Sequence, residues 1–309
     1  MEITMDINQK IATELSIKTS QVEATVQLID AGNTIPFIAR YRKEVTGALN
    51  DEVLRNLFER LNYLRNLEDR KSAVIASITE QDKMTPELFK QIQNAQTQVM
   101  VEDLYRPYRQ KRRTRATVAK EKGLEPLADK MIAFEMTSLQ EEAKKFLDDE
   151  KEVCTIEDAI NGACDILAER FADVAEYREN IRKQTMDKGV LITSAKEEKE
   201  SVYELYYDFS EPVSKLPGHR ILAINRGEKE KVLTVHIEAP QEDILRYLKK
   251  QILIKENEAT KEIIENTIAD AYVRLIAPAI EREIRSELTE KAEDGAIHVF
   301  GKNMEQLLM

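Results

Sequence analysis

Apolar side chains recur every three or four residues between residues 50 and 81, and this periodicity limits the possible folds of the chain. Asn50 is a favourable N-cap, and Asp51 and Glu52 place negative charge at the positive end of a helix. An amphipathic helix of this length must bury its apolar face against other elements. The sequence therefore predicts one long helix over about 50–81. Its apolar stripe consists of Leu54, Leu57, Phe58, Leu61, Leu64 and Leu67.

Two shorter helices are predicted before it. In "SQVEATVQLIDAGN", Ser20 and Glu23 have the spacing of a capping box, and Gly32 is a typical stop. The segment "TIPFIARYRKEVTG" then begins a second helix, with Thr34 as its cap. Two helices joined by so short a turn indicate a helix-turn-helix-like arrangement.

The remainder of the chain is also dominated by helix-forming residues, and its 309 residues include only nine glycines and eight prolines. The pattern changes after residue 189, where β-prone runs flank a turn that contains Arg226-Gly227. We expect a mostly α, elongated multi-helix assembly with a helix-turn-helix-like N-terminal part and one small β-hairpin insertion at about 220–238. We place the domain boundary near residue 190, giving domains over 1–190 and 191–309.

The stretch "RPYRQKRRTRATVAKEKG" is the first candidate for a binding site. The chain has a net charge of -11, yet residues 1–123 carry +3 and residues 124–309 carry -14. Arginine and lysine neutralise phosphates, and the neighbouring Tyr105 and Tyr108 could stack on unpaired bases. We expect nucleic-acid contact here; the alternative is that these residues pair with the chain's own carboxylates. Six basic residues and no acid lie within ten positions: Arg106, Arg109, Lys111, Arg112, Arg113 and Arg115.

A second basic set consists of Arg40, Arg42 and Lys43 in "ARYRKEV". We expect these residues to lie on the second helix of the helix-turn-helix-like pair, where a recognition helix would be. Residues that read base edges, such as Asn or Gln alternating with Arg, are not gathered there, and many helical proteins contain such a pair without touching DNA. We interpret Arg226-Gly227 as ordinary turn chemistry rather than an RNA contact.

Catalytic and metal-binding motifs are absent from the sequence. It contains no glycine-rich phosphate loop, GxSxG or HExxH, and His219, His236 and His298 are far apart. Cys154 and Cys164 have no metal-ligand spacing, and we interpret both as core residues. We therefore expect no enzyme, no catalytic residue, no metal and no cofactor. Without an apolar run of membrane length or a signal-like start, we expect a cytoplasmic protein with no membrane contact.

Five segments, taken together and in order, resemble the N-terminal and central helical regions of the bacterial transcription accessory protein family Tex, over nearly the whole chain. They are "NTIPFIARYRKEVTGALND", "VEDLYRPYRQKRRTRATVAKEKGLEPLA", "AINGACDILAER", "HRILAINRGEKEKVL" and "DAYVRLIAPAIEREIRSELTEKAEDGAIHVFGKN".

The resemblance implies an elongated, mostly helical nucleic-acid-binding protein, related in architecture to a eukaryotic transcription elongation factor. Full-length members continue with an RNase H-like domain, helix-hairpin-helix elements and an OB-fold that binds RNA. We expect this chain, which ends in the apolar "NMEQLLM", to stop before those domains. Cys164 stands where we expect an arginine in the family, so any role of that position is not carried over.

Taken together, these features predict a non-enzymatic module that supports sequence-nonspecific binding of RNA, DNA or both, and that interacts with the transcription machinery. The alternative is a helical scaffold that binds protein partners and has negligible nucleic-acid affinity of its own. The sequence does not determine the preferred nucleic acid or the oligomeric state.

Overall fold

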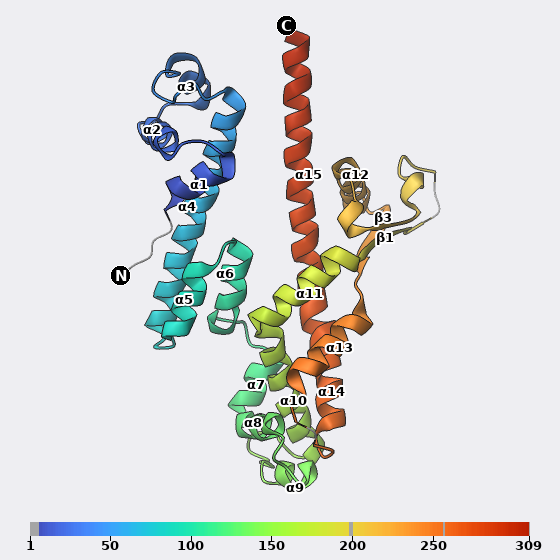
Figure 1. Cartoon of the computed structure of the whole chain (residues 1–309). Helices are drawn as coiled ribbons and strands as arrows, with labels where there is room; N and C mark the ends of the chain where they lie inside the picture. Colours follow the sequence, from blue (N-terminus) through green and yellow to red (C-terminus); the bar gives the residue numbers. More distant parts are fainter. Residues whose placement is uncertain (1–5, 198–199, 256, 309) are drawn as a thin grey trace. The chain divides into compact units, whose positions relative to one another are not determined.

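A computed structural model describes residues 6–197, 200–255 and 257–308 of the chain (Figure 1). The fold is mostly α with one small sheet, which confirms the predicted class. The chain forms two compact units, which we call unit 1, up to Arg109, and unit 2, from Gln110 onward. Each unit has its own hydrophobic core.

Unit 1 is organised around α4 (Asp51–Glu80), which is the long helix that the sequence predicted. Asn50 caps it, since its side-chain oxygen accepts a hydrogen bond from Val53 N at 2.8 Å. The leucines of the predicted stripe are buried, whereas Phe58 is 36% exposed and lies outside the core. The elements that pack with α4 are α1 (Ile7–Leu15), α2 (Thr19–Asp30), α3 (Ile35–Tyr41), α5 (Pro86–Asn94) and α6 (Gln98–Tyr105), and a 3-10 turn follows at Arg106–Tyr108.

The predicted capping box of Ser20 and Glu23 is wrong. The helix α2 begins at Thr19, two residues earlier than that box requires, with Lys18 as its N-cap residue. The Oε1 atom of Gln21 accepts a hydrogen bond from Lys18 N at 3.1 Å, so glutamine takes the place that we gave to Glu23.

Unit 2 is built around α10 (Ile156–Asp173), which contacts helices on several sides. In chain order the unit contains α7 (Arg115–Glu121), α8 (Glu125–Ala133), α9 (Leu139–Lys144), α10, α11 (Ala175–Lys188), β1 (Val190–Ala195), β2 (Asp208–Pro212), α12 (Gly218–Lys229), β3 (Leu233–Glu238), α13 (Gln241–Ile252), α14 (Lys261–Asp270), a π-helical segment at Ala271–Ile276 and α15 (Ala277–Leu308); short 3-10 turns lie at Glu204–Tyr206 and Val213–Lys215.

The three strands form an antiparallel sheet in the order β2-β1-β3, with Ile192 opposite both Ser210 and His236. The predicted hairpin over 220–238 is therefore wrong, because its first half belongs to α12. Ile221, Ile224 and Gly227 are three residues apart and all buried, which is the spacing of a helix face. The partner of β3 is β1, about forty residues earlier in the chain.

The boundary near 190 lies inside unit 2, between α11 and β1, whereas the compact units divide at residues 109 and 110. The core of unit 2 is continuous across residue 190. Ile181 on α11, Leu191 on β1 and Tyr272 in the π-helical segment belong to the same cluster of buried side chains. The change of pattern after 189 marks a change from helix to strand.

A buried ion pair joins α11 to α15. Arg178 has no exposed side-chain surface, and its Nη2 donates to Glu283 Oε1 at 2.5 Å. Arg182 Nη2 donates to the other carboxylate oxygen at 2.6 Å. A single carboxylate, which is 29% exposed, thus serves two guanidinium groups, and that of Arg178 is fully buried.

Replacing Glu283 with glutamine removes the negative charge that faces both guanidinium groups. We expect the Glu283→Gln variant to lose about 3 kcal/mol of unfolding free energy, since breaking a buried pair strands a charge. Urea unfolding followed by circular dichroism measures this. The matched control is Glu287→Gln, whose exposed pair with Lys291 should contribute less than about 1 kcal/mol. Equal losses in the two variants would contradict a structural role for the buried pair.

Gly162 allows α10 to approach its neighbours closely. A Cβ atom at this position would lie 2.3 Å from Leu124 Cδ1 and 3.3 Å from Ala119 Cβ. Leu124 is 1% exposed, so its side chain can move only by displacing other core atoms.

We expect Gly162→Ala to destabilise the protein by about 1–2 kcal/mol, because overpacking costs up to about 3 kcal/mol and alanine gains only roughly 1 kcal/mol over glycine in a helix. The control is Gly295→Ala on α15, where no atom lies within 4 Å of the added Cβ. That change should be neutral or slightly stabilising in the same urea titration. A stabilising Gly162→Ala would disprove the close approach.

Candidate nucleic-acid interface

The second basic set of the sequence lies on an exposed part of unit 1 that we call the α3 surface, formed by Phe37, Arg40, Tyr41, Arg42 and Lys43. Ile38, within the same helix, is fully buried and anchors α3 to the core. The residues from 40 to 43 are exposed, and Tyr41 keeps 59% of its surface in solvent. The helix ends at Tyr41, so the prediction that Arg42 and Lys43 lie on it is wrong; they follow directly after it. Charge and aromatic surface nevertheless lie together here.

Aromatic and guanidinium groups contact one another on the α3 surface. The rings of Phe37 and Tyr41 have centroids 5.2 Å apart. The guanidinium carbon of Arg42 lies 5.1 Å from the Phe37 ring centroid, and that of Arg40 lies 6.0 Å from the Tyr41 centroid. Such cation–π contacts orient an arginine while its charge stays hydrated. Within the described part of the chain, neither arginine nor Lys43 has an acidic ion-pair partner.

The loop after α3 is fixed to α2 by hydrogen bonds. Gln21 Nε2 donates to Thr46 O at 3.2 Å and to Gly47 O at 3.1 Å. The buried Thr46 hydroxyl donates back to Arg42 O and Lys43 O, each at 3.3 Å. The backbone that carries Arg42 and Lys43 is therefore held from both directions.

The connection between α2 and α3 is short, and Gly32 within it has φ +82°, a conformation that favours glycine. This agrees with the predicted turn between two helices. Recognition of DNA by this pair stays a prediction.

The stretch 106–115 is divided by the boundary between the two units. Arg106 and Arg109 belong to unit 1, where Arg106 is half-buried and Arg109 is exposed. Tyr105 and Tyr108 pack against the core of unit 1. The Tyr105 hydroxyl is hydrogen-bonded to Ser77 Oγ at 3.0 Å, which ties this residue to α4.

The remaining four basic residues of the stretch open unit 2, and their environments differ. Lys111 pairs with Glu169 at 3.2 Å and with Asp173, both on α10. Arg113 pairs with Glu121 at 2.9 Å. The alternative that we raised from the sequence, pairing with the chain's own carboxylates, thus applies to Lys111 and Arg113.

Arg112 and Arg115 are exposed, and in the described ranges neither makes an ion pair. Arg115 still acts on a carboxylate at a distance. Burial raises the pKa of Asp165, while the charges of Arg274 and Arg115 lower it. Arg112 is therefore the residue of this group whose charge is least compensated.

The sequence analysis missed the aromatic part of the α3 surface. Phe37 and Tyr41 are four residues apart, which places them on one face of a helix. That spacing, next to Arg40 and Arg42 in "PFIARYRK", was the available signal.

The described residues were also compared with the predictions for metal binding, membrane contact and the two cysteines. In the residues that the structure covers, no three His, Cys, Asp or Glu side chains are grouped so that they could hold a metal ion. Across the same residues, no helix is long and apolar enough to span a membrane. Cys164 is half-buried and burial raises its thiol pKa, but Cys154 is exposed, so its assignment to the core is wrong.

Comparison with known proteins finds two matching family models. The model described as Tex-like protein N-terminal domain matches residues 5–79, and the model described as Tex central region-like matches residues 135–300.

Relatives align over nearly the whole chain. It is 46% identical to the uncharacterized protein YdcI of Bacillus subtilis over 100% of its own length and 44% of the relative's. Identity is 40% to the protein tex of Bordetella pertussis, covering 97% of this chain and 40% of that protein. The transcriptional accessory protein Tex of Neisseria gonorrhoeae is 38% identical, with coverage of 99% and 41%. The chain therefore spans about two fifths of the length of these relatives.

The different environments of Lys111 and Arg112 lead to a stability prediction. We expect Lys111→Ala to reduce the unfolding free energy by about 1 kcal/mol, because it removes the cation that pairs with two partly buried carboxylates. Arg112→Ala should change it by less than about 0.5 kcal/mol, as for other surface substitutions. Urea unfolding compares the two variants. If Arg112→Ala cost as much as Lys111→Ala, Arg112 would belong to the ion-pair framework.

Proposed function

Because this chain belongs to the Tex family, we propose that it is a non-enzymatic module of a transcription accessory protein that binds nucleic acid without sequence preference. The observation that carries the proposal is the α3 surface. It combines three basic side chains that lack acidic ion-pair partners in the described part of the chain with two aromatic rings, in a protein of net charge -11.

The chemistry of the α3 surface suits single-stranded nucleic acid. Arginine and lysine neutralise phosphates and release their counterions, which gives affinity without reading the sequence. The exposed ring of Tyr41 offers a face on which a base can stack, and stacking accepts every base. Residues 40–43 contain no Asn or Gln that would pair with base edges, which favours nonspecific binding.

Arg109 and Arg112 are proposed as further phosphate contacts. Both are exposed, and no acid among the described residues pairs with either. The contribution of Lys111 and Arg113 is expected to be smaller, because nearby carboxylates already compensate their charges. Arg106 and Arg115 are the other two of the six basic residues at 106–115 for which the sequence predicts nucleic-acid contact.

A role in transcription follows from the family rather than from this surface. A relative in Neisseria gonorrhoeae carries the name transcriptional accessory protein Tex. We propose that this chain contributes nucleic-acid contact and a protein-binding surface to such a protein.

The α3 surface is tested by a triple variant, Arg40→Ala with Arg42→Ala and Lys43→Ala. Binding of labelled single-stranded RNA and of duplex DNA is measured by fluorescence anisotropy between about 50 and 200 mM salt. We expect affinity for the RNA to fall roughly tenfold or more, and the slope of log affinity against log salt to become less steep by about 2, for three phosphate contacts. Tyr41→Ala should weaken RNA binding by about 1–3 kcal/mol without changing the slope, since stacking releases no ions.

The control removes the same number of charges elsewhere. Arg55, Arg226 and Arg246 each pair with an acid three or four residues away in the chain, and their triple alanine variant should keep RNA affinity within about twofold. If this control loses as much affinity as the α3 variant, binding reflects overall charge and the assignment of the α3 surface fails. Absence of RNA binding by the unchanged protein at the lowest salt would overturn the proposed function.

A further inference from the structure

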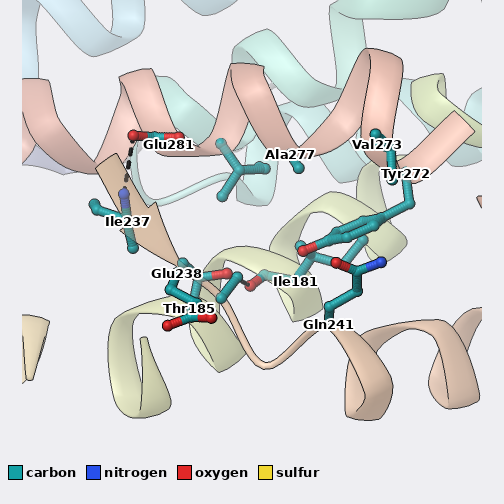
Figure 2. A pocket seen from close by; sticks show the side chains of 11 residues that line it. Ile181, Thr185, Ile237, Glu238, Gln241, Tyr272, Val273, Ala277 and Glu281 are labelled. Atoms are coloured by element: carbon teal, nitrogen blue, oxygen red, sulfur yellow. Dashed lines mark hydrogen bonds between the residues drawn. The ribbon is translucent and has the colours of Figure 1, made fainter. Parts of the chain in front are cut away.

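Unit 2 contains a pocket that is separate from the basic residues discussed above. Figure 2 shows it between α11, the end of β3, the start of α13, the π-helical segment and the start of α15. Its volume is about 260 Å³. This lies just below the usual range of about 300–1,000 Å³ for small-molecule sites, so the pocket suits a single long side chain better than a large cofactor.

The pocket has an apolar wall and an acidic edge. Ile181, Val273 and Ile280 are among the residues that form the wall. Two carboxylates, Glu238 and Glu281, line the same space, whereas no lysine or arginine of the described chain does. A cation is the charged group that this edge would attract.

The two carboxylates retain the capacity to accept hydrogen bonds. Glu281 Oε1 accepts one from Ile237 N at 3.0 Å, which fixes its position at the end of β3 (Figure 2). Glu238 is exposed, and within the described ranges it has no ion pair. An ionised carboxylate offers about four lone-pair sites, so both groups can accept further donors.

Tyr272 provides an independent indication that a ligand binds. Its side chain is 3% exposed, and its hydroxyl points into the pocket (Figure 2). No residue of the described chain hydrogen-bonds to this hydroxyl, which is accessible from the pocket and free to contact a ligand. Tyr272 belongs to the π-helical segment, a local irregularity that is frequent at functional sites.

We propose that this pocket binds an arginine or lysine side chain from a basic segment of a partner protein. The aliphatic stem would lie along the apolar wall, as such stems do when the charged head remains polar. The guanidinium or ammonium group would donate to the carboxylates of Glu238 and Glu281 and to the hydroxyl oxygen of Tyr272. An uncharged apolar ligand would leave these three groups unsatisfied.

The charge of unit 2 agrees with this assignment. Residues 110–309 contain 32 Lys and Arg against 41 Asp and Glu, so the unit attracts basic partners over a distance. A nucleic-acid phosphate would meet two carboxylates and no cation in the pocket. The site therefore complements the α3 surface with a different class of partner, and it does not depend on the proposed nucleic-acid binding.

Isothermal titration calorimetry of the full chain tests the pocket with three peptides of equal length. Each contains glycine and serine around three copies of arginine, lysine or citrulline, the last being a neutral analogue of arginine. We expect the arginine and lysine peptides to bind and the citrulline peptide to bind at least about tenfold more weakly, since it lacks the charge. Equal binding of the citrulline peptide would overturn the proposal.

Variants then locate the binding. The double variant Glu238→Gln with Glu281→Gln should bind the arginine peptide about tenfold more weakly. In this variant the side-chain amide oxygen at position 281 can still accept the hydrogen bond from Ile237 N. Tyr272→Phe should reduce the affinity for the arginine peptide by a smaller factor. Ala277→Leu should also reduce this affinity, because the larger side chain fills the pocket. Glu242 and Glu290 are exposed and do not line the pocket, so their double glutamine variant is the matched control.

If the control variant loses as much affinity as the pocket variant, binding reflects the overall charge of the protein and the proposed site is refuted. Unchanged peptide binding by Ala277→Leu would also refute it. Single-stranded RNA binding is measured on the same pocket variants and should not change. A failure of the pocket is thereby distinguished from a failure of the proposed function.

Discussion

The carboxylate of Glu283, shared between Arg178 and Arg182, fixes α11 against α15, and much of unit 2 depends on that contact. A fully buried arginine is stable only while its counter-charge is present, so the two helices cannot separate without a large electrostatic cost. Both helices form walls of the pocket that the π-helical segment closes. The side chains proposed to bind a basic residue therefore lie on β3, on the π-helical segment and on α15.

Positive charge in this acidic chain occurs in two kinds of environment, which differ in the local partners of the basic side chains. Lys111 and Arg113 contribute to the packing and surface framework of unit 2, because carboxylates lie within ion-pair distance. On the α3 surface, the partners of Arg40 and Arg42 are aromatic rings instead, which leave the charge in solvent. A dense basic run is thus a weaker guide to uncompensated positive charge than a smaller set whose neighbours are aromatic.

Some of the candidate sites could be read from the sequence and others could not. The run at 106–115 is visible at once, yet its six residues divide between two compact units. The four-residue spacing of Phe37 and Tyr41 is a local signal that could have been used. The residues of the pocket come from five elements spread over about a hundred positions, and no periodicity relates them.

The sequence by itself determined the features that depend on neighbours within a few residues. The helix at 51–80, its Asn50 cap and the mostly α class follow from apolar spacing and hydrogen bonds within one turn. Tertiary structure decided whether 218–229 is helix or strand, because burial of Ile221 and Ile224 on one face outweighs their β propensity. It also decided that β3 pairs with β1, that one core extends across residue 190, and which arginines are neutralised. These depend on contacts between distant segments, whose energies no local pattern contains.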